Sequence, residues 1–307
     1  MGFRVLASDP LDPNAIAAMR DAGLDVDEQT DLTPEQLNDV IGDYDAIVIR
    51  SATKVRADVI DAGRRLKLVV RAGVGLDNVD VAYAESKGVV VRNTPAASSN
   101  SVAELALGHI LSLARHIGRG TESMKAGRWE KKQLKGVEIA GKTLGIIGIG
   151  RIGQLLARKA HALGMSVLCS DAFLTESPLP DVASMVPLDE LLSRADVISL
   201  HIPFDPKTGA TVAGAQFERM KDGVYLVNCA RGGVVDEDAL VAALQSGKVA
   251  GAALDVFANE PPDGGHPLFA CANVSLTPHI GASTVEAQQR VGEEAASLVI
   301  EFAQSTH

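Results

Sequence analysis

Three polar residues, each following an apolar segment, could together move a proton and bind an anion. Arg231 lies in Val227–Gly233, Glu260 lies in Leu254–Pro262, and His279 lies in Thr277–Gly281. A carboxylate beside a histidine orients the imidazole and raises its pKa towards neutrality, which suits general acid–base catalysis. Arginine is always charged and can bind a carboxylate or a developing oxyanion with two hydrogen bonds. Removing hydride from a secondary alcohol requires both functions, and these residues could supply them.

A glycine-rich segment predicts a binding site for a dinucleotide. Leu144–Gly153 reads as a strand, then Gly148-Ile149-Gly150-Arg151-Ile152-Gly153, then a helix. In this G-x-G-x-x-G pattern, Gly148 permits a tight turn, Gly150 lets the backbone approach a pyrophosphate, and Gly153 lets helix and strand pack closely. Asp171 ends the next strand, 18 residues after Gly153, where a carboxylate binds the ribose 2′-hydroxyl.

The same carboxylate indicates NAD rather than NADP as the cofactor. A negative charge at Asp171 repels a 2′-phosphate, and the following Ala172-Phe173-Leu174 offers no arginine to offset it. The sequence therefore predicts NAD and no metal.

Short apolar strands alternate with helical segments almost throughout the chain, which predicts an α/β fold with parallel sheets. The expected strands are Val5–Ser8, Ala46–Ser51, Leu68–Ala72, Val89–Asn93, Thr143–Ile147, Ser166–Ser170, Val197–Leu200, Val224–Asn228, Ala250–Asp255 and Val274–Thr277. Arg231, Glu260 and His279 all follow carboxyl ends of strands, where open α/β sheets bind ligands. Capping signals predict helix starts after Thr33, Ser101 and Asp236 and within Ser283–Glu286, and a helix end at Gly247.

Two Thr-Pro junctions, Thr94-Pro95 and Thr277-Pro278, divide this pattern. We expect them to bracket one contiguous nucleotide-binding domain, residues 97–282. Residues 1–96 and 283–307 then form a discontinuous, flavodoxin-like substrate domain. The predicted fold is two Rossmann-like parallel-sheet domains, one inserted into the other.

Composition excludes several classes of protein. The chain has 307 residues, 29 Lys+Arg against 39 Asp+Glu, and a net charge of −10, so it lacks the basic surface of a nucleic-acid binder. No apolar run approaches the ~18 residues of a membrane span, and the N-terminus resembles a strand rather than a signal peptide. Cys169, Cys229 and Cys271 lack disulfide or zinc spacing. We expect reduced thiols and a cytoplasmic protein.

The combined motifs resemble those of the D-isomer-specific 2-hydroxyacid dehydrogenase family. The matching segments are Arg50–Val55, Arg71–Asp80, Gly145–Gly153, Asn228–Gly233, Ala252–Pro262 and Pro278–Thr284, and they cover the chain from about residue 5 to residue 300. Family members acting on formate carry an amide at the position of Glu260, so the acid here favours a hydroxy-acid substrate.

The resemblance implies roles for individual residues. It implies Arg231, Glu260 and His279 as the catalytic set, with His279 as the acid/base. It implies substrate contacts from Arg50, Ser51, Gly73, Val74 and Gly75, besides Arg231 and His279, and NAD contacts from Val74, Gly148, Gly150, Arg151, Ile152, Gly153, Asp171, Ile202, Ala230 and Asp255.

The resemblance implies oxidation of 3-phosphoglycerate to 3-phosphohydroxypyruvate, the first step of serine synthesis. A basic run, together with Arg50, Lys54 and Arg71 in the other domain, supports such a phosphorylated substrate. Between residues 119 and 135 six basic residues stand against two acidic ones, a local charge of +4 that would attract such a substrate; they are Arg119, Lys125, Arg128, Lys131, Lys132 and Lys135. The alternatives are a glyoxylate, hydroxypyruvate or lactate-type reductase and, in a different class, a non-enzymatic NAD(H)-sensing module.

The single tryptophan, Trp129, lies in the same run. The resemblance implies a homodimer joined through the nucleotide domains by this region, and we expect Trp129 to pack against the partner subunit. Many relatives that oxidise 3-phosphoglycerate continue into further domains beyond the point that corresponds to residue 307. The chain is therefore either a short form or a catalytic core.

Overall fold

The computed structural model describes residues 2–306, which divide into two compact units. Unit 1 comprises residues 2–99 and 282–306, and unit 2 comprises residues 100–281. The sequence had suggested boundaries at 96/97 and 282/283. No helix in the described part of the chain is long and apolar enough to cross a membrane.

Unit 1 is built on a five-stranded parallel sheet of order β2-β1-β3-β4-β5, the flavodoxin-like arrangement. Its strands are β1 (Arg4–Ala7), β2 (Asp25–Glu28), β3 (Ala46–Ile49), β4 (Leu68–Arg71) and β5 (Val90–Asn93). Helices α1 (Pro13–Asp21) and α11 (Val285–Ser305) cover one face, and α2 (Pro34–Val40), α3 (Ala57–Ala62) and α4 (Val81–Ser86) cover the other. The β3 sequence AIVI is buried throughout, as expected for a strand covered on both faces.

Unit 2 has a seven-stranded parallel sheet of order β12-β11-β10-β9-β6-β7-β8, the Rossmann order extended by one strand. The strands are β6 (Thr143–Ile147), β7 (Ser166–Ser170), β8 (Ala183–Met185), β9 (Val197–Leu200), β10 (Val224–Asn228), β11 (Val249–Leu254) and β12 (Val274–Leu276). Helices α5 (Ser99–Arg115) and α7 (Arg151–Ala162) cover one face, and α8 (Leu188–Arg194), α9 (Gly214–Arg219) and α10 (Glu237–Ser246) cover the other. The predicted fold class is confirmed.

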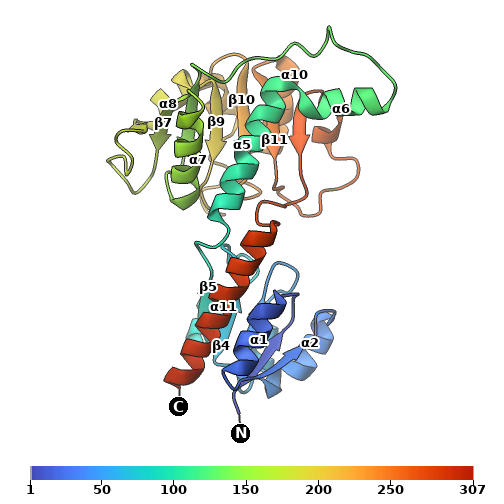
Figure 1. The fold of residues 1–307 in the computed structure, drawn as a ribbon, viewed down its shortest axis with the longest axis vertical. Coiled ribbons are helices and arrows are strands. Elements are labelled where there is room, and N and C mark those ends of the chain that lie inside the picture. The colour runs from blue at the N-terminus through green and yellow to red at the C-terminus, as the bar shows by residue number, and fades with distance from the viewer. Residues whose placement is uncertain (1, 307) are drawn as a thin grey trace. The chain divides into compact units, whose positions relative to one another are not determined.

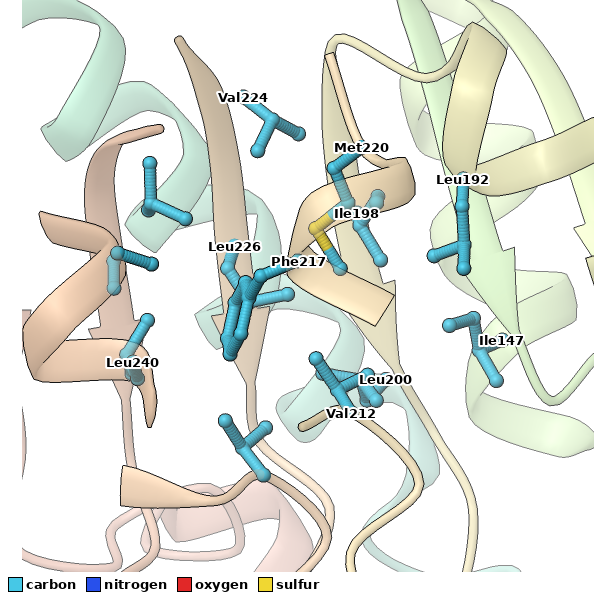
Figure 2. Close-up of a cluster of buried hydrophobic side chains, with 14 of the residues drawn as sticks. Ile147, Leu192, Ile198, Leu200, Val212, Phe217, Met220, Val224, Leu226 and Leu240 are labelled. Carbon is cyan, nitrogen blue, oxygen red and sulfur yellow. The ribbon is translucent and has the colours of Figure 1, made fainter. Parts of the chain in front are cut away.

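The packing of α8, α9 and α10 on one face of the sheet forms one of the two core layers of unit 2. Figure 2 shows Phe217 and Met220, from α9 and its end, among the strand side chains Ile198, Leu200 and Leu226. All of these are at least 97% buried. This apolar layer holds the strands rigidly, so the loops at their carboxyl ends keep fixed positions.

Local signals located most helix boundaries correctly. Thr33 and Asp236 cap their helices through side-chain hydrogen bonds, and Gly247 ends α10 in the left-handed conformation, as predicted. Within the predicted capping segment Ser283–Glu286, the residue that caps α11 is Thr284. The predicted start after Ser101 was wrong, because α5 begins at Ser99 and Ser101 lies inside the helix. The helix ends at Arg115 because His116 adopts φ +53°, and α6 (Ile117–Lys125) follows.

Two edge strands, β2 and β8, were missed by the sequence pattern. Segment β2 reads Asp-Val-Asp-Glu and contains a single apolar residue, Val26. It forms a strand because Val26 is buried against the core and Asp27 pairs with Arg4 of β1 at 2.9 Å. Tertiary contacts rather than periodicity decide this element.

Candidate functional site

The glycine turn between β6 and α7 is a close-packed corner of unit 2. Gly148 has φ +93°, and a Cβ atom there would lie 2.6 Å from the carbonyl oxygen of His201. A Cβ atom on Gly153 would lie 2.3 Å from the carbonyl oxygen of Gly148. Both positions therefore require glycine, one for backbone conformation and close approach, the other for helix–strand packing.

The space in front of this turn is open. A Cβ atom on Gly150, the N-cap of α7, would meet nothing within 4 Å. The N-terminus of this 12-residue helix presents unpaired backbone N–H groups and the positive end of its dipole, with Arg151 as the first helical residue. An anion can therefore approach the backbone at Gly150 without a side chain in the way.

Asp171 is held beside the same turn. Its Oδ2 accepts a hydrogen bond from the Ile149 amide at 3.0 Å, and its Oδ1 accepts one from Phe173 at 2.9 Å. A carboxylate has about four acceptor positions, so capacity remains for a ribose hydroxyl. The turn, the helix N-terminus and this carboxylate together fit a dinucleotide.

His279 and Glu260 form a hydrogen-bonded pair at the carboxyl edge of the unit 2 sheet. The Nδ1 atom of His279 lies 2.6 Å from Oε2 of Glu260, and the amide of Phe257 donates to Oε1 of Glu260 at 3.0 Å. Both side chains are partly exposed, 46% for His279 and 36% for Glu260. Because Nδ1 faces Glu260, Nε2 is the ring nitrogen left to exchange a proton with a ligand.

The pair shifts both groups towards their charged forms. The hydrogen bond to Glu260 raises the pKa of His279, and the charges of Glu260 and Asp255 add to this against burial and Arg231. Burial opposes ionisation of Glu260, but its bonds to His279 and Phe257 and the charge of Arg231 lower its pKa overall. His279 is therefore tuned as an acid–base group with a nearby counter-charge.

Asp255, just after β11, fixes the loop that carries His279. Its carboxylate is 1% exposed and accepts hydrogen bonds from the Thr277 hydroxyl at 2.6 Å and from the amides of Ile280 and Gly281 at 2.8 Å each. The amide of His279 donates to the Asp255 carbonyl oxygen at 2.9 Å. These bonds hold His279 at φ +51°. Contact between Asp255 and NAD remains a prediction. The hydrogen bonds described here give Asp255 a structural role in addition to that predicted contact.

Arg231 lies on the turn that follows β10, the neighbour of β11 in the sheet. The buried Asn228 side chain braces this turn by donating to the Arg231 carbonyl oxygen and accepting from the Ala230 amide, both at 3.0 Å. A Cβ atom on Gly232 would lie 1.8 Å from the carbonyl oxygen of Phe257. This contact brings the Arg231 turn against the loop that carries Glu260, so the structure places the three predicted catalytic residues on neighbouring loops of unit 2.

The predicted substrate residues of unit 1 lie at the carboxyl edge of its own sheet. Arg50 and Ser51 follow β3, and their turn is held by the buried carboxylate of Asp9, which accepts from the amides of Arg50 and Thr53. Asn78 donates to the carbonyl oxygens of Arg50 and Thr53 at 2.7 and 2.6 Å. Burial lowers the pKa of Arg50 against the charge of Asp9, yet a guanidinium stays protonated.

Arg71 is not among the predicted substrate contacts, although the sequence counts it with the basic groups that would attract a phosphate. It ends β4, beside β3, and its guanidinium crosses over Gly73, where a Cβ atom would lie 1.6 Å from Nη1. Gly73 has φ +150°, and the Val74 carbonyl oxygen accepts from Asn93 at 2.5 Å. A second guanidinium thus joins Arg50 at the predicted substrate loop, and its position directly before Gly73 was the available signal.

The basic run of residues 119–135 lies elsewhere in unit 2. Helix α5 starts at the carboxyl edge, where Val102 lies beside Gly281, and ends where His116 contacts Asn273, just before β12. Its 17 residues span about 25 Å. The basic run therefore begins at the amino edge of the sheet, opposite to His279. Figure 1 shows α6 at the upper end of unit 2. The predicted link between this run and a substrate phosphate has no support within unit 2.

A family model described as D-isomer specific 2-hydroxyacid dehydrogenase, NAD binding domain, matches residues 107–281. The chain belongs to this family. It is an NAD-dependent D-2-hydroxyacid dehydrogenase, and unit 2 contains the NAD-binding domain. Among residues 2–306, no group of three His, Cys, Asp or Glu side chains could hold a metal ion.

Relatives of the dehydrogenase differ in their substrates. It is 50% identical over 295 residues to a hydroxypyruvate reductase of Thermotoga maritima, covering 95% of each chain. It is 45% identical over 302 residues to a D-3-phosphoglycerate dehydrogenase of Archaeoglobus fulgidus, covering 98% of this chain but only 57% of that protein. A glyoxylate reductase from Paecilomyes thermophila has a similar structure, with a TM-score of 0.91 and 31% identity, covering 100% of this chain and 97% of that one.

The geometry of Asp171 predicts how the dehydrogenase discriminates between cofactors. Asp171→Ala should weaken NAD binding about tenfold or more and reduce the preference for NAD over NADP, because a hydrogen bond to a charged group contributes roughly 1.5–3 kcal/mol. Titration calorimetry with both dinucleotides measures this. Glu176→Ala removes an equal charge from an exposed position nearby and should leave both affinities unchanged. An unaltered preference in Asp171→Ala would remove this residue from the cofactor site.

Proposed function

We propose that the dehydrogenase oxidises 3-phosphoglycerate to 3-phosphohydroxypyruvate, with His279, Glu260 and Arg231 as the catalytic residues. The observation that carries the chemistry is the 2.6 Å hydrogen bond between His279 and Glu260, on a loop packed against the Arg231 turn. The secondary alcohol loses a hydride from carbon and a proton from oxygen. NAD, which the Gly148–Gly153 turn and Asp171 would hold, would accept the hydride, and a base of the protein must accept the proton.

His279, Glu260 and Arg231 would move the proton and stabilise the charges that develop on the substrate. When bound, NAD supplies the hydride acceptor. Neutral His279 takes the hydroxyl proton at Nε2, and Glu260, bonded to Nδ1, stabilises the imidazolium that results. Arg231 polarises the substrate oxygen and attracts its carboxylate. In the reverse direction the imidazolium of His279 returns the proton to the carbonyl oxygen.

The raised pKa of His279 predicts opposite pH dependences for the two directions. Reduction needs protonated His279, so it proceeds below this pKa and declines as the pH rises through it, while oxidation needs the neutral ring and shows the reverse. Glu260→Gln removes the charge that raises the pKa of His279, so both profiles should move to lower pH. His279→Gln should lower kcat by about 10²–10⁴-fold.

Initial rates in both directions between pH 5 and 10 measure these effects. His161→Ala removes an exposed histidine on α7 and should change neither the rate nor the profile. Near-normal turnover in His279→Gln, or an unmoved profile in Glu260→Gln, would contradict the assigned roles.

Two guanidinium groups support a phosphorylated substrate. Arg50 directly follows β3 and Arg71 ends the adjacent strand β4, and Arg71 lies over Gly73 in the predicted substrate loop. A substrate with a carboxylate and a phosphate needs more cationic groups than an unphosphorylated acid. A second candidate is reduction of hydroxypyruvate, which the 50% identity to a hydroxypyruvate reductase over 95% of both chains favours.

A substrate panel decides between these candidates. We expect the highest kcat/KM with 3-phosphoglycerate and 3-phosphohydroxypyruvate, followed through NADH absorbance, and lower values with hydroxypyruvate, glyoxylate and pyruvate. Arg71→Met should raise KM for the phosphorylated pair more than for hydroxypyruvate. Efficient turnover of hydroxypyruvate with none of the phosphorylated pair would establish the second candidate, and tight NADH binding without any turnover would indicate a sensing module.

We further propose a homodimer formed through α6 and the segment that follows it. This face of unit 2 presents Ile117, Met124 and Trp129 with 55, 57 and 78% of their surfaces exposed. They line a shallow apolar groove together with Leu134. Large exposed apolar patches mark interaction sites, and tryptophan is enriched at the energetic centres of interfaces.

Trp129→Ala should therefore weaken self-association at least about tenfold, because a buried interface tryptophan typically contributes 2 kcal/mol or more. Sedimentation velocity over a concentration series measures the dissociation constant. Phe173→Ala removes a side chain that is 90% exposed outside this face and serves as the control. If Trp129→Ala self-associates with the same dissociation constant as Phe173→Ala and the unmodified chain, this interface is excluded.

The proposed reaction would place the chain at the entry to serine synthesis, in the cytoplasm. Cys169, Cys229 and Cys271 are free thiols, and the first two are buried. A reducing compartment preserves such thiols.

A further inference from the structure

A buried histidine lies behind the catalytic loop, and the proposed reaction does not use it. His109, on α5 in unit 2, is 4% exposed. Its Nδ1 lies 3.0 Å from the hydroxyl of Ser275, and its Nε2 lies 3.1 Å from the hydroxyl of Thr277. Ser275 belongs to β12, and Thr277 directly follows it, two residues before His279. The ring of His109 therefore connects a helix with the strand that leads into the catalytic loop.

The direction of each hydrogen bond follows from the Asp255 carboxylate. A carboxylate has no proton to donate, so Asp255 accepts from the Thr277 hydroxyl just as it accepts from two backbone amides. The single hydroxyl proton of Thr277 therefore points to Asp255, with 2.6 Å between the two oxygen atoms. The Thr277 oxygen is then left to accept, which requires a proton on Nε2 of His109. Nδ1 of His109 then accepts the Ser275 hydroxyl proton at 3.0 Å, so in the longer 3.4 Å contact between the Ser275 and Ser112 hydroxyls Ser112 must be the donor.

This arrangement requires a neutral His109. Burial lowers the pKa of His109, and the charge of Asp255 opposes this only in part. A neutral ring has one donor and one acceptor, and the surroundings use both. The histidine is therefore a directional bridge with one permitted tautomer.

The bridge ends at the catalytic histidine. From His109 the hydrogen bonds run to Thr277, then to Asp255, whose carboxylate also holds the amides of Ile280 and Gly281. His279 lies between these points of attachment in a left-handed conformation that costs energy in a non-glycine residue. A strained residue keeps its conformation only when the surrounding contacts determine it.

We propose that His109 is a positioning residue, which fixes the Thr277 hydroxyl on Asp255 and thereby holds His279 against Glu260. This inference rests on the proposed role of His279 as the acid–base group. His109 would touch neither substrate nor cofactor, and its effect would pass entirely through Thr277 and Asp255.

A purely structural role for His109, in packing α5 against the sheet, makes a different prediction. In that case its replacement would lower stability and leave the titration of His279 unchanged. The charged groups that face His279 are Glu260, Asp255 and Arg231, and the two carboxylates raise its pKa while Arg231 lowers it. If the loop of residues 277–281 is loosened, the interactions of His279 with the two carboxylates weaken. A positioning role for His109 therefore predicts a lower pKa of His279 when His109 is replaced.

The decisive measurement is the pKa of His279 by NMR of histidine-labelled full-length protein, in His109→Leu and in Thr277→Val. His109→Leu replaces the imidazole, with its hydrogen-bond donor and acceptor, by an apolar side chain of similar size. Thr277→Val replaces only the hydroxyl by a methyl group. We expect each to lower the pKa of His279 by about half a unit or more. Turnover should fall about 3- to 10-fold, with KM for the cofactor within about twofold.

Three further variants separate positioning from packing. His109→Gln keeps an N–H donor for Thr277 and should restore most of the pKa and the turnover. Ile110→Val opens a small cavity at the next position of α5, which is 1% exposed, and should lower stability without moving the pKa. The double variant His109→Leu/Thr277→Val should be no worse than the more severe single variant, because both interrupt one chain of hydrogen bonds.

An unchanged His279 pKa in both folded single variants, or a pKa in His109→Gln as low as in His109→Leu, would overturn the proposal. If His109→Leu does not fold, Thr277→Val decides at the other end of the same hydrogen bond. The NMR titration needs no substrate, so it tests the positioning role even if the proposed reaction proves wrong. If His279→Gln is inactive but the pKa of His279 is unchanged in His109→Leu and in Thr277→Val, the proposed reaction stands and only the positioning role of His109 is rejected.

Discussion

The buried carboxylate of Asp255 imposes the constraint on which the catalytic loop depends. Burying a charge is costly unless hydrogen bonds replace its hydration, and here a hydroxyl and two backbone amides do so. All three donors come from residues 277–281, so the chain leaving β12 must curl back over the end of β11. His279 lies within that curl, which accounts for its left-handed backbone and its place beside Glu260.

The close approach of the two neighbouring loops depends on glycine. Gly232 lies where any side chain would collide with the carbonyl oxygen of Phe257, and this contact brings the Arg231 turn to the Glu260 loop. Glu237 of α10 secures the same loop by accepting from the Ala258 amide at 2.7 Å and from the ring of His266 at 2.9 Å. The residues proposed as catalytic are therefore held in place by contacts with groups outside the proposed set.

The sequence predicted most of unit 2 because its strands are apolar and its turns carry clear signals. The bounds of β6, β7, β9 and β10 agree with the expected ones, and the glycine turn has the predicted strand–turn–helix context. Strand β2 was missed because its stability comes from an ion pair and one buried valine rather than from periodicity. The basic run was linked to the substrate because charge along a sequence carries no information about the edge of the sheet at which it lies.

The sequence by itself determined the chemistry available to this dehydrogenase, since residue types and short spacings decide which groups can bind a dinucleotide, move a proton or hold an anion. The three-dimensional structure alone showed the supporting contacts: His109 reaches Thr277 across 168 positions, and Arg71 lies over Gly73. Hydrogen bonds act over about 3 Å and depend on direction, so partners distant in sequence become known only when packing has placed them. For the same reason only the structure could show that the neutral His109 is linked through hydrogen bonds to the loop that carries His279.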